Sequence, residues 1–406
     1  MTSSVEHKIF SPLKLKNITL PNRFVRSATY EGMSDSNGVV NKKIGELYGK
    51  LAQGGVGTII TGFCFVSKQG RAMQLSQAGL YNQQTMNAWK QALEIFREFR
   101  TDTKIFAQLA HTGRQTLSSV TGCAVVGAGN KKSLYFREKT RKLDADEVQS
   151  IVKEFADSAL MAKLAGFDGV QLHGAHGYLI HQFLSPETNR RNDKWKDGSL
   201  FLLNIIEKIK SKCGDDFPVL VKLSWADDRQ LKIDDTIKTV RKIEQLVDAV
   251  EISYGTMDFA MNIFRGSCPV EVAFKINPIF KNMSWFSKGL WKYFIAPQYL
   301  KRLKPFTENY NLAAAMKIKE NTNAEVFSVG GFRKLSSMKN AIDRGISAVS
   351  LCRPFICEHD LIHKFRNGSA DKSKCINCNL CAVHCDGDLS SSTLRLNTKC
   401  YYQNKD

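Results

Sequence analysis

The sequence predicts an α/β protein built on a (β/α)8 TIM barrel, with an N-terminal hairpin cap and a cysteine-bearing C-terminal extension. Eight short apolar runs rich in β-branched residues occur in order, and helical periodicity separates most of them. Continuous apolar strands indicate a parallel sheet covered by helices. Eight strand–helix units fit a barrel, which typically needs about 250 residues and tolerates insertions. A doubly wound sheet is the alternative, and the lack of GxGxxG after the first run weakens it.

The elements follow one another in a regular order. Residues 8–23, KIFSPLKLKNITLPNR, are expected to form a hairpin that caps the barrel bottom. Helices are expected at 41–55, 144–167, 204–214 and 336–345, the first of them stopping at a glycine. The expected strands are 24–28, 58–63, 104–110, 169–173, 219–224, 249–254, 325–331 and 348–353.

Two stretches, 111–143 and 255–315, exceed the usual length of a loop between strand and helix. The second is rich in aromatic residues and prolines, which favours a lid or an interface. We therefore expect a barrel domain at 1–365, with 255–315 as an insertion, and a cysteine-rich extension at 366–406.

The chain is strongly basic, with 58 Lys and Arg against 39 Asp and Glu and a formal charge of +19. Such an excess favours anionic partners. The basic residues are spread along the chain, however, and no nucleic-acid module appears. The N-terminus lacks a signal-peptide core, and no apolar run approaches the roughly 18 residues of a membrane span. We expect a cytoplasmic protein without nucleic acid or membrane as partner, and homo-oligomerisation stays open.

Polar side chains collect where the expected strands end, which is where barrel enzymes carry their chemistry. After the seventh strand come Gly330 and Gly331, and after the eighth Cys352 and Arg353, the usual phosphate-binding place of the fold. A phosphorylated cofactor is therefore favoured. The other strand-end residues are Thr29, Tyr30, Gly62, Gln108, His111, His173, His176, Tyr178, Lys222 and Ser253.

Six motifs resemble the old yellow enzyme family of flavin-dependent ene-reductases: SPLKLKNITLPNRFV, AQLAHTGRQ, GFDGVQLHGAHGYLIHQFLSPETNRR, VLVKLS, VGGFR and LCRPFICEHDL. The resemblance implies non-covalent FMN, reduced by NADH or NADPH. It places Gly330, Gly331, Cys352 and Arg353 at the phosphate and Lys222 at the pyrimidine end of the flavin ring. The expected ring contacts are Ser27, Ala28, Thr29, Tyr30, Gly62, Phe63 and Gln108.

The resemblance also implies roles for the segment HGAHGY. His173 and His176 would donate hydrogen bonds to the carbonyl oxygen of an α,β-unsaturated (enone-type) small-molecule substrate, and Tyr178 would be the general acid. One departure concerns Tyr30, which stands where better-known members carry a flavin-tuning Thr or Cys; Thr29 is one residue earlier.

Five cysteines lie in the last 32 residues, and the spacing C-x2-C-x2-C-x3-C is similar to a ferredoxin-type run. The dienoyl-CoA reductase branch of the family carries an iron–sulfur cluster here, although the third ligand is out of register. Three interpretations stay open: an iron–sulfur cluster, a zinc bound by four thiolates, or an empty remnant. The expected metal ligands are Cys375, Cys378, Cys381 and Cys400, with Cys385 as the alternative.

The leading function is thus an FMN oxidoreductase that passes hydride from NADH or NADPH to an activated alkene. An NAD(P)H:flavin or quinone oxidoreductase, or a demethylase-type relative, is the alternative enzyme. The non-enzymatic alternative is a basic binding scaffold.

Overall fold

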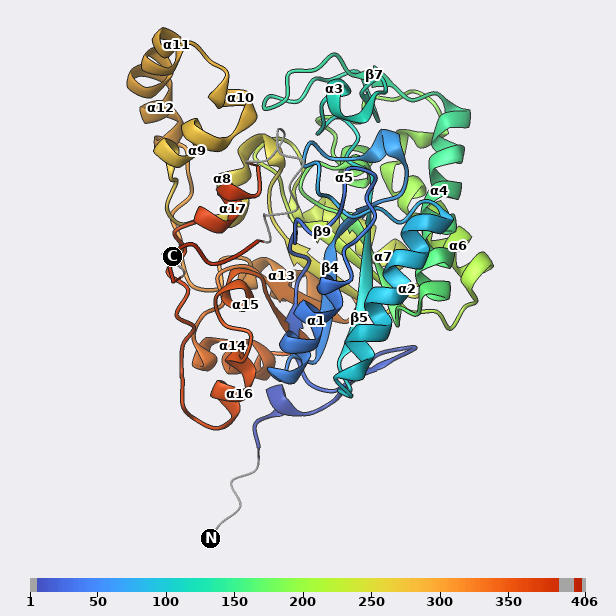
Figure 1. Cartoon of the computed structure of the whole chain (residues 1–406). Coiled ribbons are helices and arrows are strands. Elements are labelled where there is room, and N and C mark those ends of the chain that lie inside the picture. Colours follow the sequence, from blue (N-terminus) through green and yellow to red (C-terminus); the bar gives the residue numbers. More distant parts are fainter. Residues whose placement is uncertain (1–5, 387–397, 404–406) are drawn as a thin grey trace.

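The computed structural model describes residues 6–386 and 398–403, so the ends of the predicted domains (1–5, 404–406) and part of the extension (387–397) lie outside the described residues. Its centre is a closed barrel with the strand order β10-β11-β12-β3-β4-β5-β8-β9 (Figure 1). All of these strands pair in parallel, and each overlaps a predicted run, although β4 extends two residues and β8 one residue beyond it. The prediction of a TIM barrel is confirmed. The strands are β3 Phe24–Arg26, β4 Thr58–Phe65, β5 Lys104–Ala110, β8 Gly169–Gly174, β9 Val219–Ser224, β10 Ala249–Ser253, β11 Val326–Val329 and β12 Ala348–Leu351.

Helices cover the outside of the barrel. The expected helix at 204–214 was too short: it begins six residues earlier, because the Asp197 side chain accepts a hydrogen bond from Ser199 N and caps the first turn. The covering helices are α1 Lys43–Gln53, α2 Gln83–Glu98, α4 Ala145–Ala165, α6 Gly198–Cys213, α7 Ile233–Ile243, α13 Leu312–Glu320, α14 Leu335–Asp343, α15 Arg353–Cys357 and α16 Leu361–Arg366.

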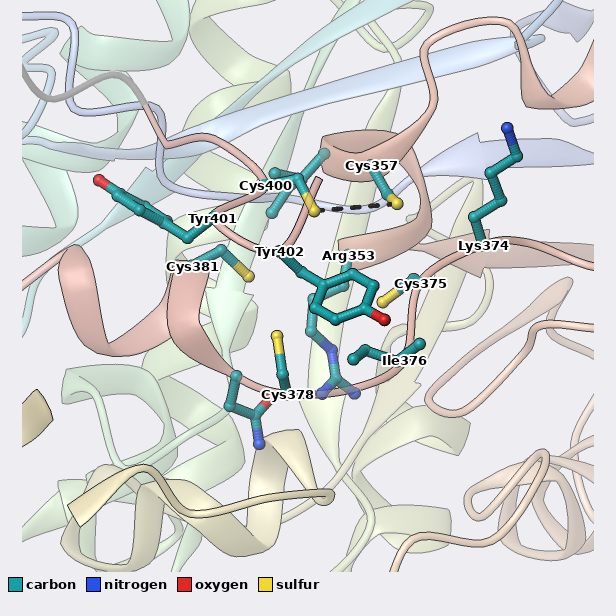
Figure 2. Close-up of a pocket in the computed structure, with 12 residues that line it drawn as sticks. Arg353, Cys357, Lys374, Cys375, Ile376, Cys378, Cys381, Cys400, Tyr401 and Tyr402 are labelled. Carbon is teal, nitrogen blue, oxygen red and sulfur yellow. Dashed lines mark hydrogen bonds between the residues drawn. The ribbon is translucent and has the colours of Figure 1, made fainter. Parts of the chain in front are cut away.

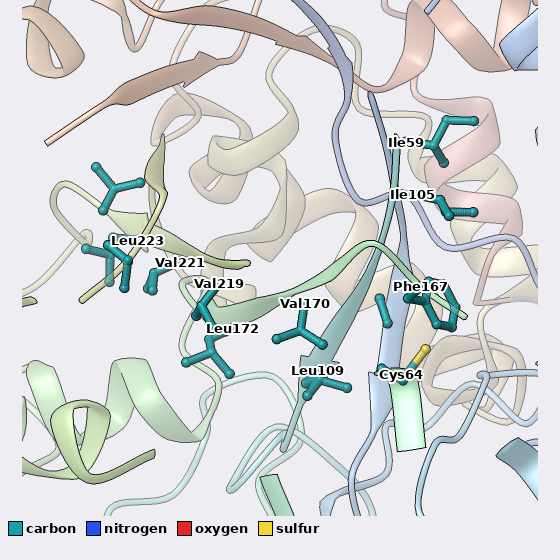
Figure 3. Packing of buried hydrophobic residues seen from close by; sticks show 14 of the residues in the cluster. Ile59, Cys64, Ile105, Leu109, Phe167, Val170, Leu172, Val219, Val221 and Leu223 are labelled. Atoms are coloured by element: carbon teal, nitrogen blue, oxygen red, sulfur yellow. The ribbon is translucent and has the colours of Figure 1, made fainter. Parts of the chain in front are cut away.

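Alternate strand residues serve two separate apolar clusters, because successive side chains of a strand point to opposite faces. Ile59, Ile105 and Val219 belong to the large cluster shared with the covering helices (Figure 3). Their neighbours Ile60, Phe106 and Leu220 pack in a second cluster with Leu13, Leu15 and Leu20 of the N-terminal segment. In that segment β1 Leu13–Lys14 pairs antiparallel with β2 Thr19–Leu20. The expected hairpin therefore exists and closes the barrel bottom.

The two long insertions lie at the opposite end. Residues 111–143 contain α3 Ser118–Thr121 and the paired short strands β6 Val126–Gly127 and β7 Arg141–Lys142. The second insertion is mostly helical: η4 Met257–Phe259, α8 Ala260–Phe264, α9 Val270–Ile276, α10 Pro278–Lys281, α11 Trp285–Leu290, the π-helix η5 Trp291–Ile295 and α12 Ala296–Lys301. No helix in the described part of the chain is both long and apolar enough to cross a membrane.

The C-terminal extension packs back onto the barrel. Lys372 forms a bridge with Lys334, and Ser373 N donates to Arg333 O at 2.9 Å. After α17 Leu380–His384, the backbone of Thr398 donates to Glu31 O at 2.8 Å, close to the end of β3. The extension thus reaches the barrel mouth.

Candidate active site

A cavity of about 1270 Å³ opens at the carboxyl ends of the strands. It is large compared with ordinary ligand pockets of about 300–1,000 Å³. The predicted residues that line it are Ala28, Thr29, Tyr30, Phe63, Gln108, His173, His176, Tyr178, Lys222, Gly330, Gly331, Cys352 and Arg353. Thirteen of the predicted cofactor and catalytic residues thus meet around one space, although they come from separate strands.

Two residues predicted to contact the flavin ring, Ser27 and Gly62, do not line the cavity but lie behind residues that do. The Ser27 hydroxyl accepts a hydrogen bond from Lys222 Nζ at 2.8 Å, so Ser27 supports a cavity residue from outside the cavity. The Gly62 backbone N–H donates to Glu31 Oε1 at 2.9 Å. His111, another strand-end residue, is buried and accepts from Gly113 N through Nδ1 at 3.0 Å. None of the three is among the residues lining the cavity.

His173, His176 and Tyr178 form a compact group on one wall. The His173 ring centre lies 5.0 Å from that of His176 and 4.7 Å from that of Tyr178, and Phe63 packs 5.5 Å from Tyr178. Burial, reinforced by the Lys222 cation, lowers the pKa of both histidines well below its ordinary value, so both are neutral at pH 7. Burial raises the pKa of Tyr178, which therefore keeps its proton.

The backbone at His176 is held in the left-handed region, with φ +62°. A non-glycine residue adopts this conformation at a cost of about 1–2 kcal/mol. Its N–H donates to Ser224 Oγ at 3.1 Å, and its carbonyl accepts from Met257 N at 2.9 Å. The ring Nε2 lies 2.8 Å from Ser253 Oγ. These contacts orient the imidazole before any ligand arrives, and such strain is typical of functional sites.

A buried polar network lies beneath the cavity floor. Lys222 Nζ lies 3.0 Å from Glu251 Oε2, and the Ser27 hydroxyl donates to the same oxygen at 3.1 Å. Gln108 Nε2 donates to Gln171 Oε1 at 2.6 Å, and Gln171 Nε2 reaches Glu251 Oε2 at 3.4 Å. Glu251 Oε1 has no hydrogen-bond partner among the described residues. The network therefore couples the two residues expected at the flavin pyrimidine ring.

Sequence reasoning missed Gln171 and Glu251, and strand parity could have found them. In β9 the inward Leu220 is followed two residues later by Lys222; in β10 Ala249 is followed by Glu251. Glu251 and Lys222 are also paired in register. A polar residue two positions beyond an inward apolar one lies in the next layer of the barrel interior.

The residues predicted to bind the phosphate line the same cavity, but they differ in whether they already have hydrogen-bond partners. Gly330 and Gly331 have φ of +126° and +82°, and a Cβ on Gly330 would lie 2.5 Å from the Tyr310 ring. Only glycine fits here. Arg353 already donates to the carbonyls of Arg265 at 2.9 Å and Phe264 at 2.5 Å, and it contacts Asn379. Its guanidinium therefore also ties the insertion and the extension together.

Sequence reasoning also missed an acidic side chain of the C-terminal extension, Asp386. Asp386 lines the cavity and accepts hydrogen bonds from Gln74 Nε2 at 2.8 Å and Asn277 Nδ2 at 3.0 Å. Burial raises its pKa to about 6. No periodicity marks this residue, because it lies in a turn after a short helix.

The predicted metal ligands Cys375, Cys378, Cys381 and Cys400 line one small pocket of about 20 Å³ (Figure 2). Cys357 joins them, with its Sγ 3.9 Å from that of Cys400. The alternative ligand, Cys385, lines the large cavity instead, and its Sγ donates to Cys381 O at 3.0 Å.

These thiols share one pocket, but they are not arranged around a common point that a metal ion could occupy. Within residues 6–386 and 398–403, no group of three or more His, Cys, Asp or Glu is arranged to hold a metal ion. Burial raises the pKa of Cys375, and raises that of Cys381 to about 12, so these thiols are protonated at neutral pH. Cysteine is a suitable ligand for a thiolate-bound metal. The arrangement of these cysteines in the described residues, however, does not form a coordination site.

Comparison with known proteins places the chain among flavin enzymes. The sequence model of the NADH:flavin oxidoreductase / NADH oxidase family matches residues 8–292. The NADH oxidase of Thermoanaerobacter brockii is 28% identical over 96% of this chain, which spans only 55% of that protein. The NADPH dehydrogenase of Bacillus subtilis is 33% identical over 64% of this chain and 77% of its own length.

A solved structure supports the fold. The old yellow enzyme homologue of Zymomonas mobilis superposes with a TM-score of 0.68 at 21% identity, over 94% of this chain and all of its own. At that identity the similarity concerns the fold alone.

Proposed function

Because the chain belongs to the NADH:flavin oxidoreductase / NADH oxidase family, we propose that it is an FMN-dependent oxidoreductase that passes hydride from NADH or NADPH to the alkene of an α,β-unsaturated carbonyl compound. One observation carries the proposal. His173, His176 and Tyr178 share a cavity with Gln108 and Lys222. Groups suited to a carbonyl substrate and groups suited to a flavin are therefore within one chamber.

The residues present fit FMN. Gln108 has an amide that can both donate and accept, as the edge of the pyrimidine ring requires, and Lys222 brings a cation to the same region. Gly330, Gly331, Cys352 and Arg353 would hold the phosphate, while Ala28, Thr29, Tyr30 and Phe63 would contact the ring, with Ser27 and Gly62 behind them. When bound, FMN supplies the hydride chemistry.

His173, His176 and Tyr178 would bind and polarise the substrate. His173 accepts the backbone N–H of Ala175 through Nδ1 at 3.4 Å, which leaves its proton on Nε2 as a donor. With His176 it would bind the substrate carbonyl, and these donors stabilise the oxygen as negative charge develops on it. Tyr178 would then donate its proton to the α-carbon.

An anaerobic visible spectrum of the purified protein tests the proposal. We expect flavin bands that bleach with NADH or NADPH and return when cyclohexenone is added. Bands that bleach but return only with a quinone would favour the alternative oxidoreductase. A colourless protein that cannot be reconstituted with FMN would refute the flavin assignment altogether.

We also propose that residues 1–365 form the FMN-binding domain and that residues 366–406 form its C-terminal extension, with Cys375, Cys378, Cys381 and Cys400 as iron–sulfur ligands. Their shared pocket supports this set over one with Cys385. Analysis of iron and acid-labile sulfide in anaerobically purified protein tests it. Stoichiometric zinc without sulfide would favour the zinc alternative, and the absence of both iron and zinc would indicate an empty remnant.

We further propose that the protein is cytoplasmic.

A further inference from the structure

The helical segment at residues 285–301 has an apolar outer face that nothing in the described part of the chain covers. Trp285 is 85% exposed, Tyr293 73%, and Phe286 and Phe294 each 66%. These residues lie on α11 and η5, which together with the adjoining α12 protrude from the barrel (upper left in Figure 1). Isolated exposed apolar residues are ordinary, but a cluster of large aromatic ones marks an interaction site.

The inner face of the same segment has a different task. Trp291 and Tyr299 line the active-site cavity, and the Trp291 ring packs 5.1 Å from that of Phe274. The segment therefore already packs one apolar face against the cavity, and its exposed aromatic residues form a second one. It has two apolar faces, of which the outer one is unused.

Charges in and beside this segment are almost all positive, although one of them, Arg302, lines the cavity. Between residues 270 and 302 the sequence has six basic residues, Lys275, Lys281, Lys288, Lys292, Lys301 and Arg302, and one acidic residue, Glu271. Glu271 is already paired with Lys292. A two-fold contact between copies of the chain would bring these cations against one another, because the same patch meets itself. An anionic surface would attract them instead.

We propose that this face docks the protein on an anionic membrane surface. Aromatic residues next to lysines are the composition of helices that lie in the lipid interface, and each cation near an anionic leaflet adds attraction. The overall charge of +19 acts in the same direction. From the sequence we expected no membrane partner; a surface contact of this kind needs no spanning helix. Docking stands independently of the proposed catalytic function.

Co-sedimentation of the full chain with vesicles tests the docking without any turnover. The probes are phosphatidylcholine vesicles with and without about 30% phosphatidylglycerol, at about 0.1 M and 0.5 M salt. We expect binding to the anionic vesicles only, and weakening at high salt. The double variant Trp285→Ser/Phe294→Ser should bind about tenfold more weakly, whereas Leu164→Ser, which alters a 60% exposed leucine on α4, should bind like the parent.

A pair of charge variants separates a local surface from general basicity. Lys281→Glu/Lys301→Glu should lose binding, while Lys43→Glu/Lys208→Glu, with the same net charge and also exposed positions, should keep it. Equal loss in both pairs, or unchanged binding of Trp285→Ser/Phe294→Ser, would overturn the proposal. So would light scattering that shows a dimer which Trp285→Ser/Phe294→Ser converts to monomer, since the face would then join two copies.

Discussion

In this barrel, the alternation of side chains along each strand decides which residues point into the interior. Leu220 and Lys222 are two positions apart on β9, and Ala249 and Glu251 are two apart on β10, so all four point inward. The lower layer is apolar and packs on the hairpin. The next layer bears a buried cation and its counter-ion, directly below the cavity.

Removing the buried cation should be costly. Lys222 and Glu251 are almost fully buried, so Lys222→Met leaves an unpaired buried carboxylate and should lower the free energy of unfolding by about 3–5 kcal/mol. Lys222→Met/Glu251→Met should recover most of that loss. Urea unfolding measures both, with Lys242→Met as control: its half-exposed pair with Asp197 should contribute less than about 1 kcal/mol. A double variant as unstable as the single one would contradict the coupling.

Tyr178→Phe tests the proton donation that we propose for Tyr178 separately from hydride transfer. The ring and its contacts with His173 and Phe63 stay, and only the hydroxyl is lost. Flavin reduction by NADH or NADPH should be unchanged, whereas reoxidation by cyclohexenone should slow by about 10²–10⁴-fold. Stopped-flow absorbance resolves the two half-reactions. An unaffected reoxidation rate would assign the proton to another donor.

At the scale of elements, the turn after β11 forms the end of the cavity that we propose holds the phosphate. Its two glycines adopt positive φ and pass close to Tyr310, whose hydroxyl donates to Ile263 O at 2.9 Å and so cannot swing aside freely. The turn is thus shaped by its own backbone and by the insertion packed against it.

Gly330→Ala should disrupt this end. Its Cβ would lie 2.5 Å from the Tyr310 ring and 2.6 Å from Asn311 Nδ2, so we expect a loss of about 2–4 kcal/mol in the free energy of unfolding and weaker FMN retention. Gly345→Ala is the matched control, with φ +98° but open space around its Cβ; it should cost about 1 kcal/mol and leave FMN bound. Thermal unfolding and ultrafiltration measure the two effects, and equal behaviour of both variants would refute the role of close packing.

At the scale of the whole molecule, three distant parts of the chain close the cavity. Gln74 follows β4, Asn277 lies in the insertion and Asp386 belongs to the extension, yet the two amides donate to the one carboxylate. The extension is therefore part of the cavity wall as well as the location of the clustered cysteines.

The Asp386 carboxyl should make stability depend on pH. Its pKa in the folded protein is about 6, above the ordinary 3.8, so folding favours the protonated form. Its contribution is therefore greatest below about pH 4 and is lost as pH rises towards 6, by up to about 3 kcal/mol. Asp386→Asn should flatten the free energy of unfolding between pH 4 and 6. Urea titrations across that range check it, with Asp343→Asn, an exposed carboxyl, as control. An unchanged slope would mean that this carboxyl does not titrate there.

The old yellow enzyme resemblance, the barrel, the order of its strands, the hairpin and thirteen of the residues that line the cavity follow from the sequence alone. This is because apolar runs of strand length and polar strand ends are local patterns, and the fold brings all strand ends to one mouth. The start of α6 was misjudged because its cap, Asp197, lies outside the apolar pattern. The position of Asp386, the shared pocket of Cys357 and Cys400, the engagement of Arg353 and the bare outer face of residues 285–301 were decided only by the tertiary structure. Each depends on packing between segments far apart in the chain, which no local pattern of residues encodes.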